Sequence, residues 1–429
     1  MDSERAAYLT LGCLVEPGHR ALGETVLSRG PVGALSALLR GGISPELSAA
    51  AAARLRGRAP AQLATAMLEH AERLGARLVT PVDEEWPSQL ADLVRISHGD
   101  SRKDRDTLPP LCLWVRGGRA LQDAFARSVA VVGARAATSY GEHAAAEIAF
   151  GLADRGWTVV SGGAYGIDSA AHRGALAAGG LTVAVLACGV DRAYPASNAS
   201  LFERIAVEGL VVSEWPPGSD PHRHRFLVRN RVIAAATRGT VVVEASARSG
   251  ARQTLRRARS LGRATMAVPG PVTSAMSVGC HAELREEHTR LVTGWADVLE
   301  EVGMIGVDLA PLPEGPRHER DTLDHVCAQV LDGLPRRGSA CAEDIAASAG
   351  VSVSDALRSL GLLRIRGFVV GHADGAYALA APSLSHPATP PGPPARSQPA
   401  PPPPSQPAPP PPGQPAPPPP GQPAPLPPG

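Results

Sequence analysis

Residues 128–133 read SVAVVG, a short apolar run that ends in glycine. Similar runs follow along the chain: WTVVSGG at 157–163, LTVAVLACG at 181–189, GLVVSE at 209–214, GTVVVEA at 239–245 and RATMAVPG at 263–270. The segments between these runs have the length and apolar spacing of helices, near 140–154, 166–178, 198–208, 229–237 and before 263. Short apolar strands that alternate with helices predict a buried parallel sheet built from βαβ units.

The predicted fold class is therefore α/β, and the other parts of the chain surround this central sheet. We expect an extended Rossmann-like domain over residues 76–305, preceded at 1–75 by a small helical domain of the SAM or helix-hairpin-helix type. A linker at 306–320 leads to residues 321–381, where three helical segments and a hairpin with an Asp-Gly turn indicate a winged-helix domain. Residues 382–429 carry a repeat of the type QPAPPPP, which predicts an extended, disordered polyproline tail.

The composition of the 429 residues limits the classes of protein to consider. Six cysteines occur without a C-x-x-C motif and without the Cys/His spacing of a zinc site, which argues against a disulfide framework and against a zinc site. The chain shows no secretion signal and no apolar run near the roughly 20 residues that span a bilayer. We therefore expect a cytoplasmic protein that does not cross the membrane.

Positive charge is concentrated in one stretch, although the formal net charge of the whole chain is only +1. Residues 222–263 contain eleven arginines and one acid, Glu244. Guanidinium groups match the geometry of phosphate oxygens, so this clustering predicts a polyanionic ligand such as a nucleic acid. Two glycine-containing loops, which follow the strands near 132 and 161, add to this expectation. Each opens a predicted helix, where backbone N–H groups favour an anion.

Seven motifs in order resemble the DprA/Smf family of DNA-processing proteins. They are VVGARAATSYG at 131–141, SGGAYGIDSAAHRGAL at 161–176, TVAVLACGVDRAYPASNASLF at 182–202, GLVVSEWPPG at 209–218, RFLVRNRVIAAAT at 225–237, TVVVEASARSG at 240–250 and AVPGPV at 267–272. The resemblance implies an extended Rossmann fold that binds single-stranded DNA. It also implies a homodimer that protects incoming DNA and hands the strand to the recombinase RecA during natural transformation.

The same resemblance implies which residues hold the DNA. They are Gly133 and Arg135 in the first loop, Ser161, Gly162, Gly163, Gly166, Asp168 and His172 in and after the second, and Phe226, Arg229, Asn230 and Arg231 in the F-x-x-R-N-R element. Phe226 has two interpretations, because it could stack on a base or pack as a core aromatic under the basic face. Residues 279–288, GCHAELREEH, are acidic where the family has a small apolar turn, so we expect the last unit of the sheet to differ.

Two other functions compete with DNA binding. The first is a nucleotide-hydrolysing Rossmann enzyme of the lysine-decarboxylase-like type, which needs a glutamate on the helix after a late strand. Here Glu244 precedes that turn instead. The second is transcription regulation through the winged helix, whose third helical segment could equally bind a protein. The sequence shows no grouped carboxylates or positioned nucleophile, so we expect no catalytic residue, no cofactor and no metal.

Overall fold

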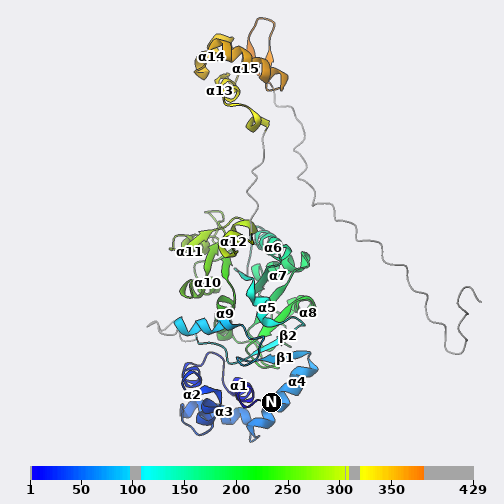
Figure 1. The fold of residues 1–429 in the computed structure, drawn as a ribbon, viewed down its shortest axis with the longest axis vertical. Helices are drawn as coiled ribbons and strands as arrows, with labels where there is room; N and C mark the ends of the chain where they lie inside the picture. The colour runs from blue at the N-terminus through cyan, green and yellow to red at the C-terminus, as the bar shows by residue number, and fades with distance from the viewer. Residues whose placement is uncertain (1, 97–107, 305, 309–318, 381–429) are drawn as a thin grey trace, which may run out of the picture. The chain divides into compact units, whose positions relative to one another are not determined.

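The computed structural model describes residues 2–96, 108–304, 306–308 and 319–380. The chain forms two compact units, Met1–Leu312 and Pro313–Gly429 (Figure 1). The predicted polyproline tail from 382 lies outside the described residues. The finer division of the first unit into domains at 1–75 and 76–305 stays a prediction.

One large sheet dominates the first unit, and its described strands are ordered β1-β2-β6-β5-β4-β3-β7-β8-β9. Their bounds are β1 (Ala76–Val79), β2 (Leu113–Arg116), β3 (Ser128–Val132), β4 (Thr158–Ser161), β5 (Thr182–Leu186), β6 (Leu210–Ser213), β7 (Gly239–Val242), β8 (Ala264–Ala267) and β9 (Thr289–Leu291). The strands from β6 to β9 are parallel. This confirms the predicted α/β class with a Rossmann-like parallel sheet.

The order of the strands reverses next to β3. From β3 the chain builds outward through β4, β5 and β6 on one side, and β7, β8 and β9 then extend the sheet on the other. In an open parallel sheet, the crevice beyond the carboxyl ends of the two strands at such a reversal is the usual ligand site. The topology therefore places a candidate site at the ends of β3 and β7.

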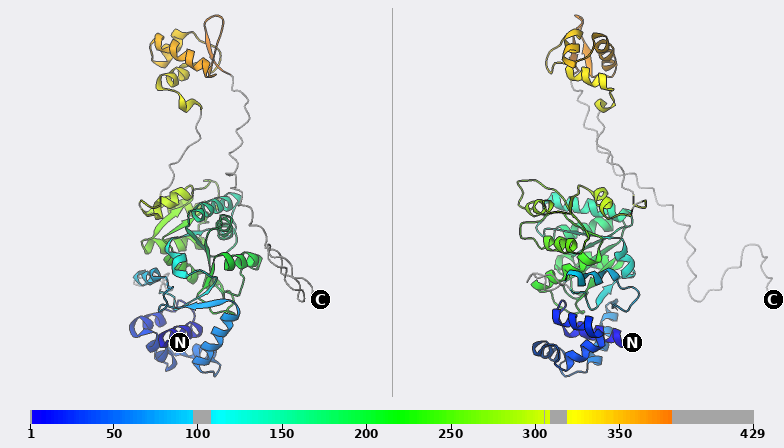
Figure 2. Two further views of the ribbon diagram at one scale, coloured as in Figure 1. Left: turned by 45° about the vertical axis from the view of Figure 1, so that its right-hand side comes forward. Right: turned by 60° about the vertical axis from the view of Figure 1, so that its left-hand side comes forward.

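Helices cover both faces of this sheet (Figure 2). Alternate residues of β3 face opposite layers, with Val129 and Val131 in one apolar cluster and Ala130 and Val132 in the other, as the pleat of a strand requires. The first layer contains α6 (Ser139–Asp154), α7 (Ile167–Ala177), α8 (Ala199–Glu208) and α12 (Trp295–Val302). The second contains η1 (Ser88–Ile96), α5 (Leu121–Ala126), α9 (Arg223–Ala236), α10 (Gly250–Ser260) and α11 (Val278–Leu284). A short turn, η2 (Ala196–Asn198), precedes α8.

Strands β1 and β2 are an addition that the apolar pattern did not predict. They lie before the first apolar run at 128, and they extend the sheet beyond β6 with antiparallel pairing. Four helices gather beyond this edge (Figures 1 and 2). They are α1 (Ser3–Leu14), α2 (Arg20–Leu39), α3 (Pro45–Leu55) and α4 (Pro60–Arg73). Leu9 of α1, Ala71 of α4 and Leu78 of β1 share one buried cluster, so these helices pack on the sheet rather than stand apart.

The acidic segment 279–288 does not remove the last unit of the sheet. Helix α11 forms within it, and β9 pairs with β8 directly after it. The Glu283 side chain is fully buried and accepts hydrogen bonds from Arg252 at 2.8 Å and Arg259 at 2.9 Å. Burial raises the pKa of Glu283, but these arginine hydrogen bonds outweigh it and the pKa lies below its ordinary value. The expected difference is therefore a buried ionic cluster, not a missing unit.

The second unit contains a short turn, three helices and a hairpin. The elements are η3 (Glu319–Thr322), α13 (His325–Gly333), α14 (Ala342–Ala349), α15 (Val353–Ile365), β10 (Val369–Gly371) and β11 (Tyr377–Leu379). Gly350 ends α14 with a φ of 68°, a left-handed conformation that favours glycine. These elements follow the order that the sequence predicted, while their identity as a winged-helix domain stays a prediction.

Candidate nucleic-acid interface

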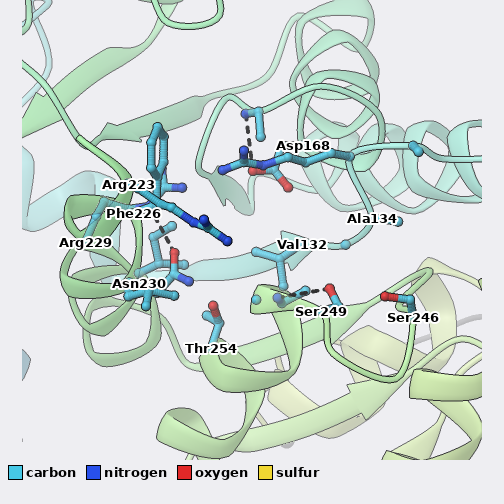
Figure 3. Close-up of a pocket in the computed structure, with 18 of the residues that line it drawn as sticks. Val132, Ala134, Asp168, Arg223, Phe226, Arg229, Asn230, Ser246, Ser249 and Thr254 are labelled. Carbon is cyan, nitrogen blue, oxygen red and sulfur yellow. Dashed lines mark hydrogen bonds between the residues drawn. The ribbon is translucent and has the colours of Figure 1, made fainter. Parts of the chain in front are cut away.

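A cavity of about 750 Å³ lies where the strand order reverses. Residues 132–136 at the end of β3 line it on one side. On another side it is lined by Ser246, Ser249, Gly250 and Ala251, which lie after β7 and at the start of α10. The first turns of α9 complete it with Arg223, Phe226 and Leu227. Figure 3 shows these three segments converging on one space. The fold thus provides one concave site at the position where Rossmann-like sheets bind ligands.

Two exposed arginines give this cavity its charge. Arg135 follows β3, and Arg223 is the first residue of α9. Among the described residues, neither guanidinium forms an ion pair with a carboxylate, whereas most other arginines of the basic stretch do. The acidic residue in the lining, Asp168, is buried beneath the second glycine loop. The cavity therefore carries positive charge that remains available to an anion.

An aromatic pair lies beside these cations. The Arg135 guanidinium lies 4.8 Å from the centroid of the Phe226 ring, and the Tyr194 ring lies 5.3 Å from it at an angle of 46°. Phe226 is half-buried and Tyr194 is 42% exposed, so both rings border solvent in the cavity. Phe226 also packs against the buried cluster of Ala187, Trp215 and Val228, so stacking on a base stays a prediction. Sequence pattern alone did not single out Tyr194, although it lies in a quoted motif.

In the first glycine loop, a carboxylate of the protein already binds the backbone at the start of α6. Glu244, at the end of β7, accepts hydrogen bonds from the Thr138 backbone N–H at 2.8 Å and from the Thr138 hydroxyl at 2.6 Å. Thr138 is the N-cap of α6, so the positive end of that helix faces a carboxylate of the protein. Gly133 lines the cavity, where a Cβ would come within 2.9 Å of the Glu244 carbonyl oxygen. The lone acid of the basic stretch is thus a helix cap.

In the second glycine loop, the Asp168 carboxylate likewise binds backbone N–H groups. Its carboxylate accepts hydrogen bonds from the backbone N–H groups of Gly162 at 3.2 Å and Ala164 at 3.3 Å. Burial raises the pKa of Asp168, while Arg229 and these N–H groups act in the opposite direction. The sequence predicted these N–H groups as phosphate donors. In this conformation the protein's own carboxylate takes the N–H groups of Gly162 and Ala164, and a phosphate contact by this loop stays a prediction.

Two other glycines of the second loop, Gly163 and Gly166, stand where a side chain would not fit. Gly163 has a φ of 67°, and a Cβ there would lie 2.4 Å from the Phe202 ring. Gly166 has a φ of 70° and lies against the carbonyl oxygens of the first loop. The Ser161 hydroxyl is buried and donates to the Val131 carbonyl at 2.7 Å. Gly166 thus packs on the first loop, whereas Gly163 packs on α8 and Ser161 bonds to β3.

Arg229 lines the cavity, but its guanidinium is buried and bonds to backbone carbonyls of the protein. Its guanidinium donates to the Gly162 carbonyl at 2.8 Å and to the Val185 carbonyl, and its side chain is buried. Burial lowers the pKa of Arg229 to about 10. The Asn230 side-chain oxygen accepts a hydrogen bond from Arg229 at 3.1 Å. Arg229 and Asn230 thus support the cavity floor, and the expectation that Arg229 lies open on the ligand face is wrong.

Arg231 and His172 are buried away from the cavity. Arg231 is 0% exposed and forms two hydrogen bonds of 2.6 Å with Glu214. The His172 ring nitrogen Nδ1 lies 2.7 Å from the Thr182 hydroxyl oxygen, and burial lowers the pKa of His172 to about 3. Phosphate contacts by these two side chains are contradicted by their burial. The sequence could not show this, since alternate arginines on a helix look equally available.

Internal pairing also accounts for much of the basic stretch. Arg263 pairs with Asp92 at 2.8 Å and Arg225 with Glu16 at 2.6 Å, while Arg252 and Arg259 pair with Glu283. The clustering of charge in the sequence therefore overstates how many of these arginines are available to a ligand. In the part of the chain that the structure describes, no group of three or more His, Cys, Asp or Glu side chains is arranged to hold a metal ion. Among the same residues, no helix is both long and apolar enough to cross a bilayer.

The fold and the cavity define a Rossmann-like protein with a concave site lined by exposed arginines and two aromatic rings. Residues 77–303 match the family described as DNA recombination-mediator protein A. The chain is 45% identical over 367 residues to a DNA processing protein DprA of Mycobacterium tuberculosis, which covers 86% of this chain and 92% of that protein. It is 44% identical over 173 residues to the DprA of Streptococcus pneumoniae, covering 40% of this chain and 61% of that one.

The comparison of folds also finds a DprA protein. The crystal structure of DprA from Streptococcus pneumoniae aligns with a TM-score of 0.55 at 29% identity and covers 71% of this chain and 99% of that one. The chain therefore belongs to the DNA recombination-mediator protein A family, and the resemblance to DprA/Smf proteins is confirmed. Its function is that of a DNA-processing protein in recombination, and the two competing functions are not favoured.

Proposed function

We propose that the chain binds single-stranded DNA in the cavity at the ends of β3 and β7. The observation that carries this proposal is the pairing of two unneutralised arginines, Arg135 and Arg223, with two solvent-bordering rings, Phe226 and Tyr194. Arginines bind phosphates, and aromatic side chains stack on bases whose faces are free, with about 1 to 3 kcal/mol per stacked base. Only unpaired bases offer those faces readily, so a single strand suits the site better than a duplex.

The bound strand is read by its backbone and stacking surface rather than by its sequence. The cavity lining offers arginines, aromatic rings, hydroxyls and backbone groups, while its carboxylate Asp168 is used internally. Contacts of this kind give affinity with little sequence preference. Of the residues predicted as ligand contacts, Gly133, Arg135 and Phe226 keep this role in the proposal. Arg223 and Tyr194 join them.

The role of the bound complex follows from the family. We propose that the protein acts as a homodimer, protects incoming DNA and hands it to a RecA-type recombinase, as the name recombination mediator supports. A cytoplasmic location agrees with the six cysteines, all of which are free thiols in the described residues.

We propose no catalytic step and no cofactor. The two carboxylates nearest the cavity, Asp168 and Glu244, accept hydrogen bonds from loop and helix-start N–H groups, so neither is placed as a general base. His172, four residues after Asp168, is buried against Thr182 instead of facing the cavity. A hydrolytic activity would need one of these groups to leave its present partner.

Fluorescence anisotropy with a single-stranded oligonucleotide, the matching duplex and a mononucleotide tests this proposal. We expect the single strand to bind best and the double variant Arg135→Ala/Arg223→Ala to lower the slope of log Kd against log salt by about 1.4, because each phosphate contact contributes about 0.7. The control Arg119→Ala/Arg173→Ala removes the same charge from exposed arginines that do not line the cavity. Equal loss in both double variants, or preference for duplex DNA, would contradict the proposal.

A further inference from the structure

A second cavity of about 560 Å³ lies between the N-terminal helices and the Rossmann-like part. Its lining comes from α1, from the end of α3, from α4 and from residues 215–219 after β6. The charged side chains of this lining are Arg54, Arg56, Arg58, Arg225 and Glu16. Four cations against one anion leave a formal excess of three positive charges, so this cavity is also suited to an anion.

The single acid of the lining does not oppose an anionic ligand strongly. Glu16 accepts hydrogen bonds from the Trp215 indole at 2.7 Å, from Arg225 at 2.6 Å and from Arg54 at 3.2 Å. Burial raises the pKa of Glu16, but these hydrogen bonds outweigh it and the pKa lies below its ordinary value. The carboxylate is therefore charged and already balanced by two of the four arginines.

The other two arginines are exposed and form no ion pair among the described residues. Arg56 ends α3 in the left-handed conformation, with a φ of 50°, and Gly57 follows with a φ of 78°. The Arg58 guanidinium donates a long hydrogen bond of 3.4 Å to the Leu55 carbonyl, to which the Arg58 backbone N–H also donates at 2.9 Å. This bond covers one of the last carbonyls of α3, which would otherwise repel an anion. The tight turn thus places two available cations at the cavity.

The two cavities are neighbours along one short segment. Gly218, Ser219 and Arg225 line the second cavity, whereas Pro221 and Arg223 line the first. Since consecutive Cα atoms are about 3.8 Å apart, Ser219 and Pro221 lie within about 7.6 Å of each other. The linings of the two cavities therefore come close together at this segment, so one strand can pass from Arg223 to the second cavity.

We propose that the second cavity binds phosphates of the same single strand, so that the N-terminal helices form part of the DNA-binding surface. Arg56 and Arg58 are the contacts, and Arg225 and Arg54 neutralise Glu16 beneath them. This inference rests on the proposed function, because the strand is first held in the cavity with Arg135 and Arg223. It adds that binding strengthens once an oligonucleotide is long enough to reach both cavities.

The test uses the full chain with two lengths of oligothymidylate, about 2 and about 20 nucleotides, which bracket the roughly 4 to 16 nucleotides that single-strand binding folds occupy. The variant Arg56→Ala/Arg58→Ala should leave binding of the short oligonucleotide unchanged. For the long one, it should lower the log-log salt slope by about 1.4. Between about 50 and about 200 mM salt, the wild type should then lose about seven-fold more affinity than the variant. The matched control is Arg29→Ala/Arg40→Ala, which removes two exposed arginines of α2 and its C-cap that line neither cavity.

Each outcome decides the inference. Unchanged binding of the long oligonucleotide by Arg56→Ala/Arg58→Ala overturns it, and so does an equal loss in the control. Loss of the short oligonucleotide as well, with an unchanged thermal transition, overturns it too, since the two cavities would not act separately. If the wild type binds neither length, the proposed function itself fails. If the wild type binds the short oligonucleotide normally, and Arg56→Ala/Arg58→Ala does not change binding of the long one, only the second cavity is rejected.

Discussion

The Arg231 guanidinium and the Glu214 carboxylate form two hydrogen bonds of 2.6 Å each inside the Rossmann-like part of the chain. Their side chains are 0% and 4% exposed. The arginine also donates to the Leu108 carbonyl at 2.8 Å, which ties α9 to the chain segment before β2. An arginine from the F-x-x-R-N-R motif, whose pattern suggests DNA contact, is thus part of the core.

We predict that Arg231→Ala destabilises the protein by about 3 to 5 kcal/mol, because the Glu214 carboxylate remains buried without its partner. Arg223→Ala, on the same helix but exposed, should change the free energy of unfolding by no more than about 0.5 kcal/mol. Urea denaturation followed by circular dichroism measures both. If Arg231→Ala unfolds at the wild-type midpoint and loses only DNA affinity, then Arg231 contacts DNA.

Phe226→Ala should weaken single-strand binding by about 1 to 3 kcal/mol, since it removes the ring that lies against Arg135 and Tyr194. Phe226→Trp should keep most of the affinity because it retains a stacking surface. Phe226→Leu is the control that retains apolar volume without a π face. Equal affinities of Phe226→Leu and wild type, measured by anisotropy, would show that stacking plays no part.

Glu244→Ala should lower stability by about 1 to 3 kcal/mol, because the Thr138 N–H and hydroxyl lose their acceptor at the start of α6. Glu244→Gln should have a smaller effect, since its side-chain oxygen can still accept from the N–H. Thermal denaturation measures the order of the two variants. A stable Glu244→Ala protein that nevertheless loses a DNA-cleaving activity present in the wild type would instead identify Glu244 as catalytic.

The buried His172 should make the protein less stable in acid. Burial, together with Arg229, lowers the pKa of His172 to about 3, whereas the unfolded chain titrates near the ordinary value of 6.5. Below about pH 6.5 the unfolded state binds a proton that the folded state does not. The free energy of unfolding therefore decreases as the pH is lowered. Between about pH 7.5 and about pH 4.5, His172→Gln should lose about 2 to 3 kcal/mol less than the wild type. Parallel pH profiles of urea stability would contradict this.

The local elements and the class of the fold could be predicted from sequence pattern alone. The apolar runs from 128 onward became parallel strands, and the glycines at 163 and 166 adopt positive φ at the loop between strand and helix. These features depend on short-range patterns, since a strand needs a run of apolar residues and a left-handed turn needs a glycine. Strands β1 and β2 could not be predicted in this way, because strands of only four residues beside prolines carry little pattern of their own.

Which charges are available to a ligand depends instead on the tertiary structure. The sequence placed eleven arginines in one stretch, yet Arg231, Arg252 and Arg263 pair with acids at positions 214, 283 and 92. An ion pair depends on distance in space, and these partners come from other elements of the fold. The strand order, which brings the ends of β3 and β7 together, likewise leaves Arg135 and Arg223 facing one cavity. No local pattern contains that order, because it arises from how the βαβ units pack on one another.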